Sequence, residues 1–280
     1  MSGTGGTAGR LLVVSTPIGH LGDFSFRGVE ALKAAAVVAA EDTRHTRTLL
    51  AHYGIAAPLV SLHAHSGGAK IEQLLDRVAS GDTVAYVTDA GTPGISDPGG
   101  ELVERAHARG LKVEPVPGAS AVLAALAGSG FPSDRFVFLG FLPRKGGGRA
   151  AALERIAREE MTTVCYEAPG RTSPLLEDLA EACGADRPAA VARELTKLHE
   201  EIRRGTLGEL ATYYGEHPPR GEVTVVIGGR PDMPPAPVET PDADALVREL
   251  KGTGAPAAVA KELARRLGIS RQEAYRLLTR

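Results

Sequence analysis

Residues 87–100 place the strongest constraint on the fold of this chain. Six of these fourteen residues are glycine or proline, and threonine, serine and two aspartates stand between them. The segment follows the apolar run 83–87 and precedes a helical pattern that starts near Glu101. Because such a segment continues neither a strand nor a helix, the backbone must turn sharply at the carboxyl end of a strand. Ligands bind at that edge of an α/β sheet, so we predict a ligand site here.

Short apolar runs alternate with helical patterns throughout residues 10–120. Strands are predicted at 10–15, 37–40, 59–62, 83–87 and 112–115, and helices at 26–36, 46–53, 70–80 and 101–109. This alternation is typical of an α/β fold, in which helices cover both faces of a largely parallel sheet. A polar or Gly/Pro-rich cluster follows each predicted strand, and the carboxyl ends of parallel strands share one edge. We therefore expect these clusters to form one binding edge.

The pattern changes after residue 120 and indicates a second α/β domain with more antiparallel strands. Its predicted strands are 136–142, 162–166, 189–193 and two near 199–205 and 222–227, and its helices are 120–128, 149–159 and 173–183. The expected domains are a disordered tail at 1–9, an N-terminal α/β domain at 10–120 and a C-terminal α/β domain at 121–230, followed by a proline-rich linker at 231–241 and a helical extension at 242–280. The extension resembles a helix-turn-helix, in which Ser270 caps the last helix.

Composition places the chain among ordinary globular proteins. It has 280 residues, 43% of them hydrophobic, and a formal net charge of −2, so no global charge indicates a nucleic-acid partner. Two segments, 135–149 and 256–280, are locally basic, which fits either solvated surface or RNA contact. We expect a cytoplasmic protein without a membrane segment or signal peptide. Its two cysteines, Cys165 and Cys183, indicate neither a disulfide framework nor a zinc site.

The predicted binding edge lacks the common nucleotide and hydrolase motifs. The chain contains no G-x-G-x-x-G between a strand and a helix, no P-loop, no H-E-x-x-H and no G-x-S-x-G. The strand-end clusters instead offer backbone groups, hydroxyls and small residues, which suit a neutral or zwitterionic adenosyl ligand. No cluster of metal ligands is evident, so the sequence assigns no metal site and leaves metal dependence open.

Five ordered motifs carry a family resemblance. They read STPIG at 15–19, AEDTRH at 40–45, DAGTPGISDPG at 89–99, PGAS at 117–120 and ARELTK at 192–197. Together they resemble the tetrapyrrole-methylase superfamily, and within it the branch that modifies ribosomal RNA. The resemblance spans roughly residues 10–230, and the helical tail is similar to the C-terminal extension of that branch.

The resemblance implies the activity and its partners. It implies S-adenosylmethionine as methyl donor, bound in a cleft between two α/β domains of a homodimer. It also implies 2′-O-methylation of a cytidine in the decoding region of 16S rRNA within the small ribosomal subunit. The cofactor-binding residues that it implies are Pro17, Asp89, Ala90, Gly91, Thr92, Ile95, Ser120 and Ala121, with Tyr166, Ala168, Ala192, Glu222 and Val223 beside adenosine.

The acceptor side of the site is expected at two charged motifs. A ribose hydroxyl is a weak nucleophile at neutral pH and reacts faster beside a base or a cation. We therefore predict an acceptor side formed by Asp42, Arg44, Lys145, Glu194 and Lys197. Each motif also has a purely structural interpretation, because an aspartate caps helices well and residues three apart form ordinary ion pairs. The sequence singles out no general base.

Basic residues in two segments are the candidate RNA contacts. Arg144, Lys145 and Arg149 lie on or beside a Gly-rich loop that can clamp phosphates. The cations of the tail either hold rRNA or brace a dimer. Two other functions remain open at this point: a methyltransferase acting on a precorrin or another tetrapyrrole, and a non-catalytic module that binds an adenosyl ligand or RNA.

Overall fold

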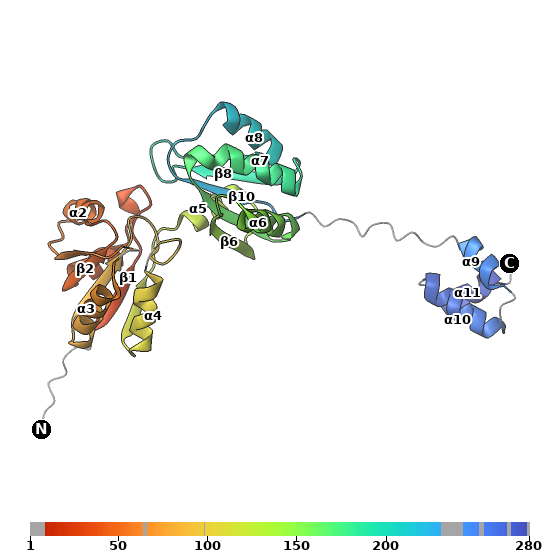
Figure 1. Ribbon diagram of the computed structural model, residues 1–280, viewed down its shortest axis with the longest axis horizontal. Helices are drawn as coiled ribbons and strands as arrows, with labels where there is room; N and C mark the ends of the chain where they lie inside the picture. The colour runs from red at the N-terminus through yellow and green to blue at the C-terminus, as the bar shows by residue number, and fades with distance from the viewer. Residues whose placement is uncertain are drawn as a thin grey trace, which may run out of the picture. The chain divides into compact units, whose positions relative to one another are not determined.

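The computed structural model describes residues 9–63, 66–97, 99–230, 243–251, 255–267 and 270–278. The chain divides into two compact units, Met1–Arg230 and Pro231–Arg280. The larger unit contains two five-stranded sheets (Figure 1). The predicted tail, apart from Gly9, and the predicted linker lie outside the described residues. The proposed division of the larger unit at residue 120 stays a prediction.

The first sheet is entirely parallel, as the alternating pattern predicts. Its strands are β1 (Arg10–Val14), β2 (Val37–Ala40), β3 (Leu59–Ser61), β4 (Thr83–Val87) and β5 (Lys112–Val116). They are ordered β3-β2-β4-β1-β5, and every neighbouring pair runs parallel. Because the strands are parallel, their carboxyl ends meet at one edge, where the polar and Gly/Pro-rich clusters begin.

Helices cover both faces of this sheet. They are η1 (Leu21–Asp23), α1 (Phe26–Lys33), α2 (Thr43–His52), α3 (Gly68–Ala79) and α4 (Gly100–Ala108). Buried residues of α1 and α2 pack with Leu12 and Val14 on one face, and those of α3 and α4 pack with Leu11 on the other. Helix α2 begins before the predicted residue 46, because the Asp42 side chain accepts a hydrogen bond from the amide of Arg44.

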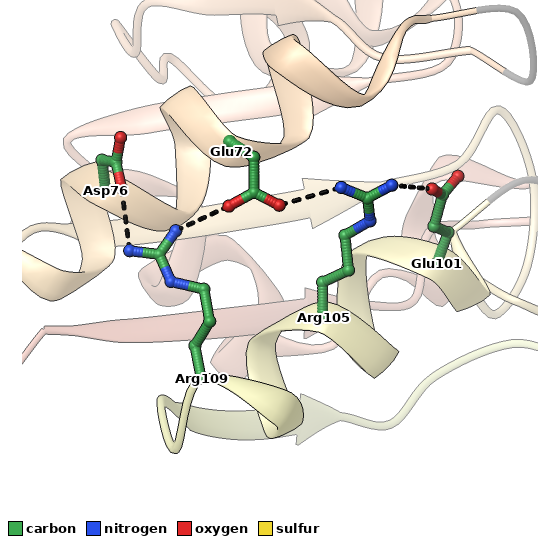
Figure 2. Close-up of polar contacts among 5 residues, drawn as sticks. All are labelled: Glu72, Asp76, Glu101, Arg105 and Arg109. Atoms are coloured by element: carbon green, nitrogen blue, oxygen red, sulfur yellow. Dashed lines mark hydrogen bonds and ion pairs between the residues drawn. The ribbon is translucent and has the colours of Figure 1, made fainter.

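An ion-pair network ties α4 to α3 (Figure 2). Glu72 accepts from Arg105 at 2.9 Å and from Arg109 at 3.0 Å. Arg105 also pairs with Glu101 at 2.6 Å, and Arg109 pairs with Asp76 at 2.8 Å. Helix α4 follows the 87–100 segment directly, so the network holds the helix into which that segment leads.

Replacing Glu72 with glutamine tests this network. Both arginines lose the charge that they share, but all of these groups are partly exposed and screened by solvent. We expect a small decrease in Tm that largely disappears in about 1 M salt, where screening extends over only about 3 Å. Thermal unfolding at low and high salt measures it, with the exposed Glu104→Gln on α4 as the matched control. Equal behaviour of the two variants would show that the network contributes nothing measurable.

The second sheet is mixed, as predicted. Its strands are β6 (Phe136–Phe141), β7 (Thr162–Glu167), β8 (Pro188–Arg193), β9 (Glu201–Thr206) and β10 (Val223–Ile227). They are ordered β6-β7-β10-β8-β9. Only β6 and β7 pair in parallel, and the other three neighbouring pairs are antiparallel.

Four helices of the described chain pack on this sheet, one of them alone on its face. Helix α5 (Ala121–Ser129) packs against Ala190, Ala192 and Val226 on one face. The opposite face carries α6 (Gly147–Arg158), α7 (Thr172–Cys183) and α8 (Leu207–Glu216). Figure 1 shows α7 and α8 lying side by side over this sheet. The sequence pattern missed α8, which begins at a capping box formed by Thr206 and Glu209.

The smaller unit has its own hydrophobic core. It contains α9 (Ala243–Leu250), α10 (Pro256–Leu267) and α11 (Arg271–Leu278), which bury Leu246, Leu263 and Ala274 among others. The predicted cap at Ser270 is confirmed, since its hydroxyl accepts a hydrogen bond from the amide of Glu273. Arg265 and Arg266 pair with Glu262, and their hydrogen bonds lower the pKa of Glu262 to about 2. Part of the predicted positive charge of the tail is therefore balanced within the unit.

None of the described helices has both the length and the apolar character that a membrane crossing requires. No group of three or more His, Cys, Asp or Glu side chains in the described ranges is arranged to hold a metal ion.

Candidate functional site

A cavity of about 370 Å³ lies at the edge predicted from the sequence. It is bordered by residues that follow β1, β2, β4 and β5 of the first sheet and by the ends of β6, β7 and β10 of the second. A hollow of about 430 Å³ elsewhere is lined only by α6 and the two residues after it, so it joins no separate elements. The strand-end cavity is therefore the candidate site.

Hydrogen bonds join the strand-end loops that form the floor of this cavity. Thr16 and Gly91 exchange two backbone hydrogen bonds, of 2.9 and 3.1 Å. The hydroxyls of Ser15 and Thr92 lie 3.0 Å apart, and Thr92 also donates to the carbonyl of Ala119 at 3.3 Å. These contacts link the loops after β1, β4 and β5. They hold the 87–100 segment in a defined conformation rather than as a free loop.

A glycine is required where this segment enters α4. Gly99 has a φ of +152°, and a Cβ atom at this position would overlap the ring of Tyr86. Tyr86 is fully buried within the first sheet. Because the ring has no room to move away, a side chain at residue 99 is excluded both by backbone conformation and by packing.

Carboxylates line the same loops. Thr88 donates to Glu41 at 3.0 Å, and the side chain of Asp89 accepts from the amide of Asp42 at 3.0 Å. The carboxylate of Asp97 accepts from the amide of Gly94. Burial raises the pKa of both Glu41 and Asp97, against the opposing effect of their hydrogen bonds. The cavity therefore holds negative charge that has been partly removed from water.

Replacing Asp97 with asparagine tests the cost of that charge. A carboxyl whose pKa rises on folding stabilises the protein while protonated, and this contribution is lost as the pH rises through the folded-state pKa. We expect Asp97→Asn to unfold at higher denaturant concentration than the wild type at pH 7, with the difference vanishing below about pH 3.5. Urea unfolding across this pH range measures it. The exposed Asp134→Asn is the control, and a variant less stable than wild type at pH 7 would contradict the expectation.

The second sheet supplies the opposite wall. The ring of Tyr166 packs against Phe138 and Phe141, with centroids 5.0 and 5.4 Å away. The next residue, Glu167, has a side chain that is only 1% exposed and pairs with Arg171 at 2.5 Å. Its carboxylate also accepts from the amide of Ala168 at 2.7 Å. An aromatic surface thus lies beside a buried, compensated carboxylate.

The ARELTK motif packs onto the loop after β1. A Cβ atom at Gly19 would lie 2.5 Å from Cγ of Lys197, so glycine permits this close approach. The amide of His20 donates to the hydroxyl of Thr196 at 3.0 Å. Lys197 in turn donates to Glu194 and to Glu222, both at 3.0 Å. Since Glu222 lines the cavity, the motif reaches the site through that contact.

Most of the predicted cofactor residues lie on the cavity wall. They are Asp89, Ala90, Gly91, Thr92, Ile95, Ser120, Ala121, Tyr166, Ala168, Glu222 and Val223. Pro17 and Ala192 are not part of this wall. Pro17 precedes Ile18, which lines the cavity, and Ala192 is 1% exposed in the core beneath α5. Their assignment stays a prediction.

The predicted acceptor-side residues lie in three places, and none of them lines the cavity directly. Asp42 and Arg44 form an ion pair of 2.7 Å at the start of α2, which together with the backbone bond lowers the pKa of Asp42 to about 2. Glu194 and Lys197 form a second pair, and their hydrogen bond lowers the pKa of Glu194. Lys145 is exposed just before α6.

The Gly-rich segment near Lys145 differs from the predicted loop. Gly147 and Gly148 begin helix α6 instead of forming part of a longer loop. Arg149 is 15% exposed, pairs with Asp178 of α7 at 2.5 Å and donates to the carbonyl of Pro143. Its side chain thus ties α6 to α7. Arg144 and Lys145 remain the exposed cations of this segment.

Several residues of the wall were not among the predicted site residues. They are Ile18, Glu41, Thr88, Ser96, Asp97, Phe141, Glu167, Pro169 and Thr224. One signal was present, because Glu41 and Glu167 both sit at the end of a buried strand. A charged residue that ends a buried strand at the ligand edge is a candidate wall residue.

The sequence matches a known family and proteins with a shared name. The model of the family described as Tetrapyrrole (Corrin/Porphyrin) Methylases matches residues 10–211. A Synechocystis protein named "Ribosomal RNA small subunit methyltransferase I" is 44% identical over 96% of this chain and 97% of its own length. A Xylella fastidiosa protein of the same name is 45% identical over 96% of this chain and 98% of its own.

Solved structures with the same fold include several enzymes whose names indicate substrates that differ from one another. A cobalt precorrin-4 methyltransferase superposes with a TM-score of 0.62 and 21% identity, covering 78% of this chain and 94% of its own. A diphthine synthase gives a TM-score of 0.60 and 19% identity, covering 78% and 90%. Uroporphyrin-III C-methyltransferase from Thermus thermophilus, complexed with S-adenyl homocysteine, gives 0.54 and 24%, covering 79% and 97%. At these identities the likeness shows the fold alone.

Proposed function

Because the chain belongs to the tetrapyrrole methylase family, we propose that it transfers a methyl group from S-adenosylmethionine to the ribose 2′-hydroxyl of a cytidine in the decoding region of 16S rRNA. The observation that carries this proposal is the identity with small-subunit rRNA methyltransferases over nearly the full length of both chains. The precorrin and diphthine enzymes share the fold at much lower sequence identity, so their substrates are not evidence for the substrate of this chain.

The charge of the cavity suits a cationic donor. Five carboxylates line it and the described wall contains no lysine or arginine; the five are Glu41, Asp89, Asp97, Glu167 and Glu222. Glu167 and Glu222 are paired with Arg171 and Lys197. The sulfonium and ammonium groups of S-adenosylmethionine are therefore attracted mainly by Glu41, Asp89 and Asp97. A phosphate-bearing nucleotide would be repelled by the same wall. The residues present therefore fit the proposed donor.

Part of the backbone of the 87–100 segment is already engaged in hydrogen bonds within the loops. The amide of Gly91 already donates to Thr16 and that of Ile95 to Thr92, and the amide of Gly94 donates to Asp97. The carbonyls of Thr88, Gly91 and Thr92 also accept hydrogen bonds within the loops. Contacts to a ligand therefore fall to the other backbone groups and the small side chains of this segment, and a carbonyl oxygen among them is a suitable partner for an ammonium group.

The proposed reaction depends on positioning. When bound, S-adenosylmethionine supplies an electrophilic methyl group on sulfur. The interlinked loops hold the donor side rigidly, and an in-line displacement gains much of its acceleration from such alignment. On the acceptor side we assign Asp42, Arg44, Lys145, Glu194 and Lys197, where cations stabilise the oxygen as it loses its proton.

Glu41 joins these residues as a candidate proton acceptor. It lines the cavity, is fixed by Thr88, and burial raises its pKa. The low pKa of Asp42, caused by its hydrogen bonds from Arg44, makes that carboxylate a weaker base. We therefore place Glu41 nearer to the proton transfer and Asp42 in the positioning of the loop.

Alanine at Asp42 or at Glu194 is expected to slow methyl transfer. Loss of Asp42 removes the ion-pair partner of Arg44, and loss of Glu194 leaves Lys197 paired with Glu222 alone. We expect the single-turnover rate to fall about 10-fold or more while cofactor affinity stays within about 2-fold. Rapid-quench assays and calorimetric titration of the cofactor separate the two quantities. Unchanged single-turnover rates in both variants would refute the assignment.

The proposal extends to partners and location. We place the protein in the cytoplasm, where the small ribosomal subunit is its substrate particle, and propose that it acts as a homodimer. We assign rRNA contacts to Arg144 and Lys145 and to the helical extension at 242–280. The independent core of that extension supports a separate binding role.

Direct mapping of the product tests this function. Small subunits that lack the modification are incubated with the protein and S-adenosylmethionine, and the rRNA is digested and analysed by mass spectrometry. A single new 2′-O-methylcytidine in the decoding region is expected. Transfer of label to a corrinoid precursor and not to subunits would favour the tetrapyrrole alternative. Donor binding without transfer to any RNA would favour a non-catalytic module.

A further inference from the structure

A second pocket lies on the face of the second sheet that carries α6, α7 and α8. Its volume is about 260 Å³, and it is formed at the end of β8, the start of β9 and the end of α8. The residues that carry the argument are Arg193, Glu201, Tyr213, Tyr214, His217 and Arg220. None of them belongs to the wall of the first cavity.

Positive charge dominates this pocket. Glu201 accepts hydrogen bonds from Arg193 at 2.7 Å and from Arg203 at 2.9 Å. The guanidinium of Arg203 lies 3.7 Å from the centre of the Tyr213 ring, on which His217 stacks. Glu201 thus pairs with Arg193, which lines the pocket, and with Arg203 beside the pocket, and Arg220 adds a second cation to the lining. The pocket keeps an excess of positive charge after its internal pairs are formed.

The hydroxyl of Tyr214 is the second observation that points to a ligand. The side chain is 1% exposed, and the hydroxyl has no hydrogen-bond partner among the described residues. Burial raises the pKa of Tyr214 to about 12, so the group is a neutral donor at physiological pH. A buried donor without an acceptor is unfavourable, and a bound oxygen atom would satisfy it.

The pocket and the acidic cavity share one edge of the sheet. Arg193 of β8 pairs in register with Val223 of β10, which lines the cavity. The next residue, Glu194, donates its amide to the carbonyl of Glu222 at 3.1 Å. The cavity wall repels phosphates, so a polyanionic substrate presented to it needs cations nearby. This pocket provides them on the adjacent strand.

We propose that this pocket binds a backbone phosphate of the RNA substrate, with Arg193 and Arg220 facing its charge and Tyr214 donating to one of its oxygens. Arginine and neutral hydroxyl donors are the usual protein partners of nucleic-acid phosphates. The inference rests on the proposed function, because it takes the substrate to be RNA. It adds a phosphate subsite that lies apart from the methyl-donor cavity.

Two substitutions in the full-length protein test the subsite. Tyr214→Phe removes only the hydroxyl, and it is expected to weaken binding to unmethylated small subunits about 5-fold without lowering Tm. Arg220→Ala is expected to weaken binding by a similar factor and to reduce the slope of log K against log salt by about one. Arg158→Ala on α6, exposed and outside the pocket, is the charge-matched control and should bind as wild type. Affinity for S-adenosylmethionine should stay unchanged in all three.

The outcomes separate this inference from the function on which it rests. Wild-type affinity in both pocket variants, or equal losses in the Arg158→Ala control, would overturn the subsite while leaving rRNA methylation intact. A lower Tm for Tyr214→Phe with normal binding by Arg220→Ala would assign the pocket a structural role and overturn it as well. A second arm titrates inorganic phosphate against potassium chloride at equal ionic strength. Suppose that inorganic phosphate protects the wild type, that this protection is lost in Tyr214→Phe, and that the protein binds no subunit. The ligand would then be a free phosphate, and both the RNA subsite and the proposed function would be refuted.

Discussion

Phenylalanine in place of Ala121 is expected to weaken S-adenosylmethionine binding at least about 100-fold, equivalent to about 2.7 kcal/mol. Ala121 is the first residue of α5 and lines the cavity of about 370 Å³. A ring at this position occupies space that the donor needs, and close-packed neighbours leave it little room to turn away. Because the ring enters an existing cavity, we expect Tm to change little. Methyl transfer at ordinary donor concentrations should become undetectable.

Isothermal titration of the donor measures this effect, and circular dichroism checks the fold. The matched control is Ala127→Phe, which adds the same ring at an exposed position of the same helix. It should bind the donor as the wild type does. Normal donor affinity in Ala121→Phe would mean that the donor binds elsewhere, and the assignment of the cavity would have to be abandoned.

Alanine in place of Arg171 is expected to destabilise the protein by about 2 to 3 kcal/mol. The partner carboxylate of Glu167 is 1% exposed, whereas Arg171 is 34% exposed. Removing the cation leaves a buried charge whose remaining hydrogen bond comes from the amide of Ala168. The figure lies below that for a fully buried pair, because water already screens the arginine in part. For a unit of this size the loss corresponds to a Tm decrease of roughly 5 to 10 °C.

A double-mutant cycle identifies the source of this loss. Glu167→Gln keeps the shape of the side chain and removes its charge, so Arg171→Ala should cost much less in that background. Urea unfolding followed by circular dichroism gives the four free energies. Equal costs of Arg171→Ala in both backgrounds would show that the arginine contributes through packing alone.

Local chemistry was sufficient to predict the edge of the site. The 87–100 segment carries enough glycine and proline to force a turn wherever the chain goes, and alternating strands and helices make the sheet parallel. These two properties place Asp89 and Gly91 at the same edge as Ser120 before any contact is known. The structure has this arrangement, and all three line the cavity.

The sequence did not predict which face of the second sheet each residue of β8 occupies. Alternation along β8 separates Ala192 from Arg193, but it does not tell which face of the sheet meets the donor cavity. In the structure Ala192 packs beneath α5, while Arg193 lies in the second, positively charged pocket on the other face. Ala192 was assigned to the cofactor site because it belongs to the ARELTK motif. The pocket around Arg193 could not be predicted in the same way, because it also requires β9 and α8, and α8 was not predicted.

The 87–100 segment, the parallel sheet and the family motifs were determined by the sequence itself, because each depends on residues close together in the chain. Tertiary structure alone decided which charges meet at the site. Lys197 reaches Glu222, Thr88 fixes Glu41, and the amide of Asp42 contacts Asp89, all between residues at least 25 positions apart. Whether a carboxylate is paired, buried or exposed depends on these distant neighbours, since burial and nearby charge set its pKa and its energy. For this reason the burial of Glu167 and the raised pKa of Asp97 followed only from the folded chain.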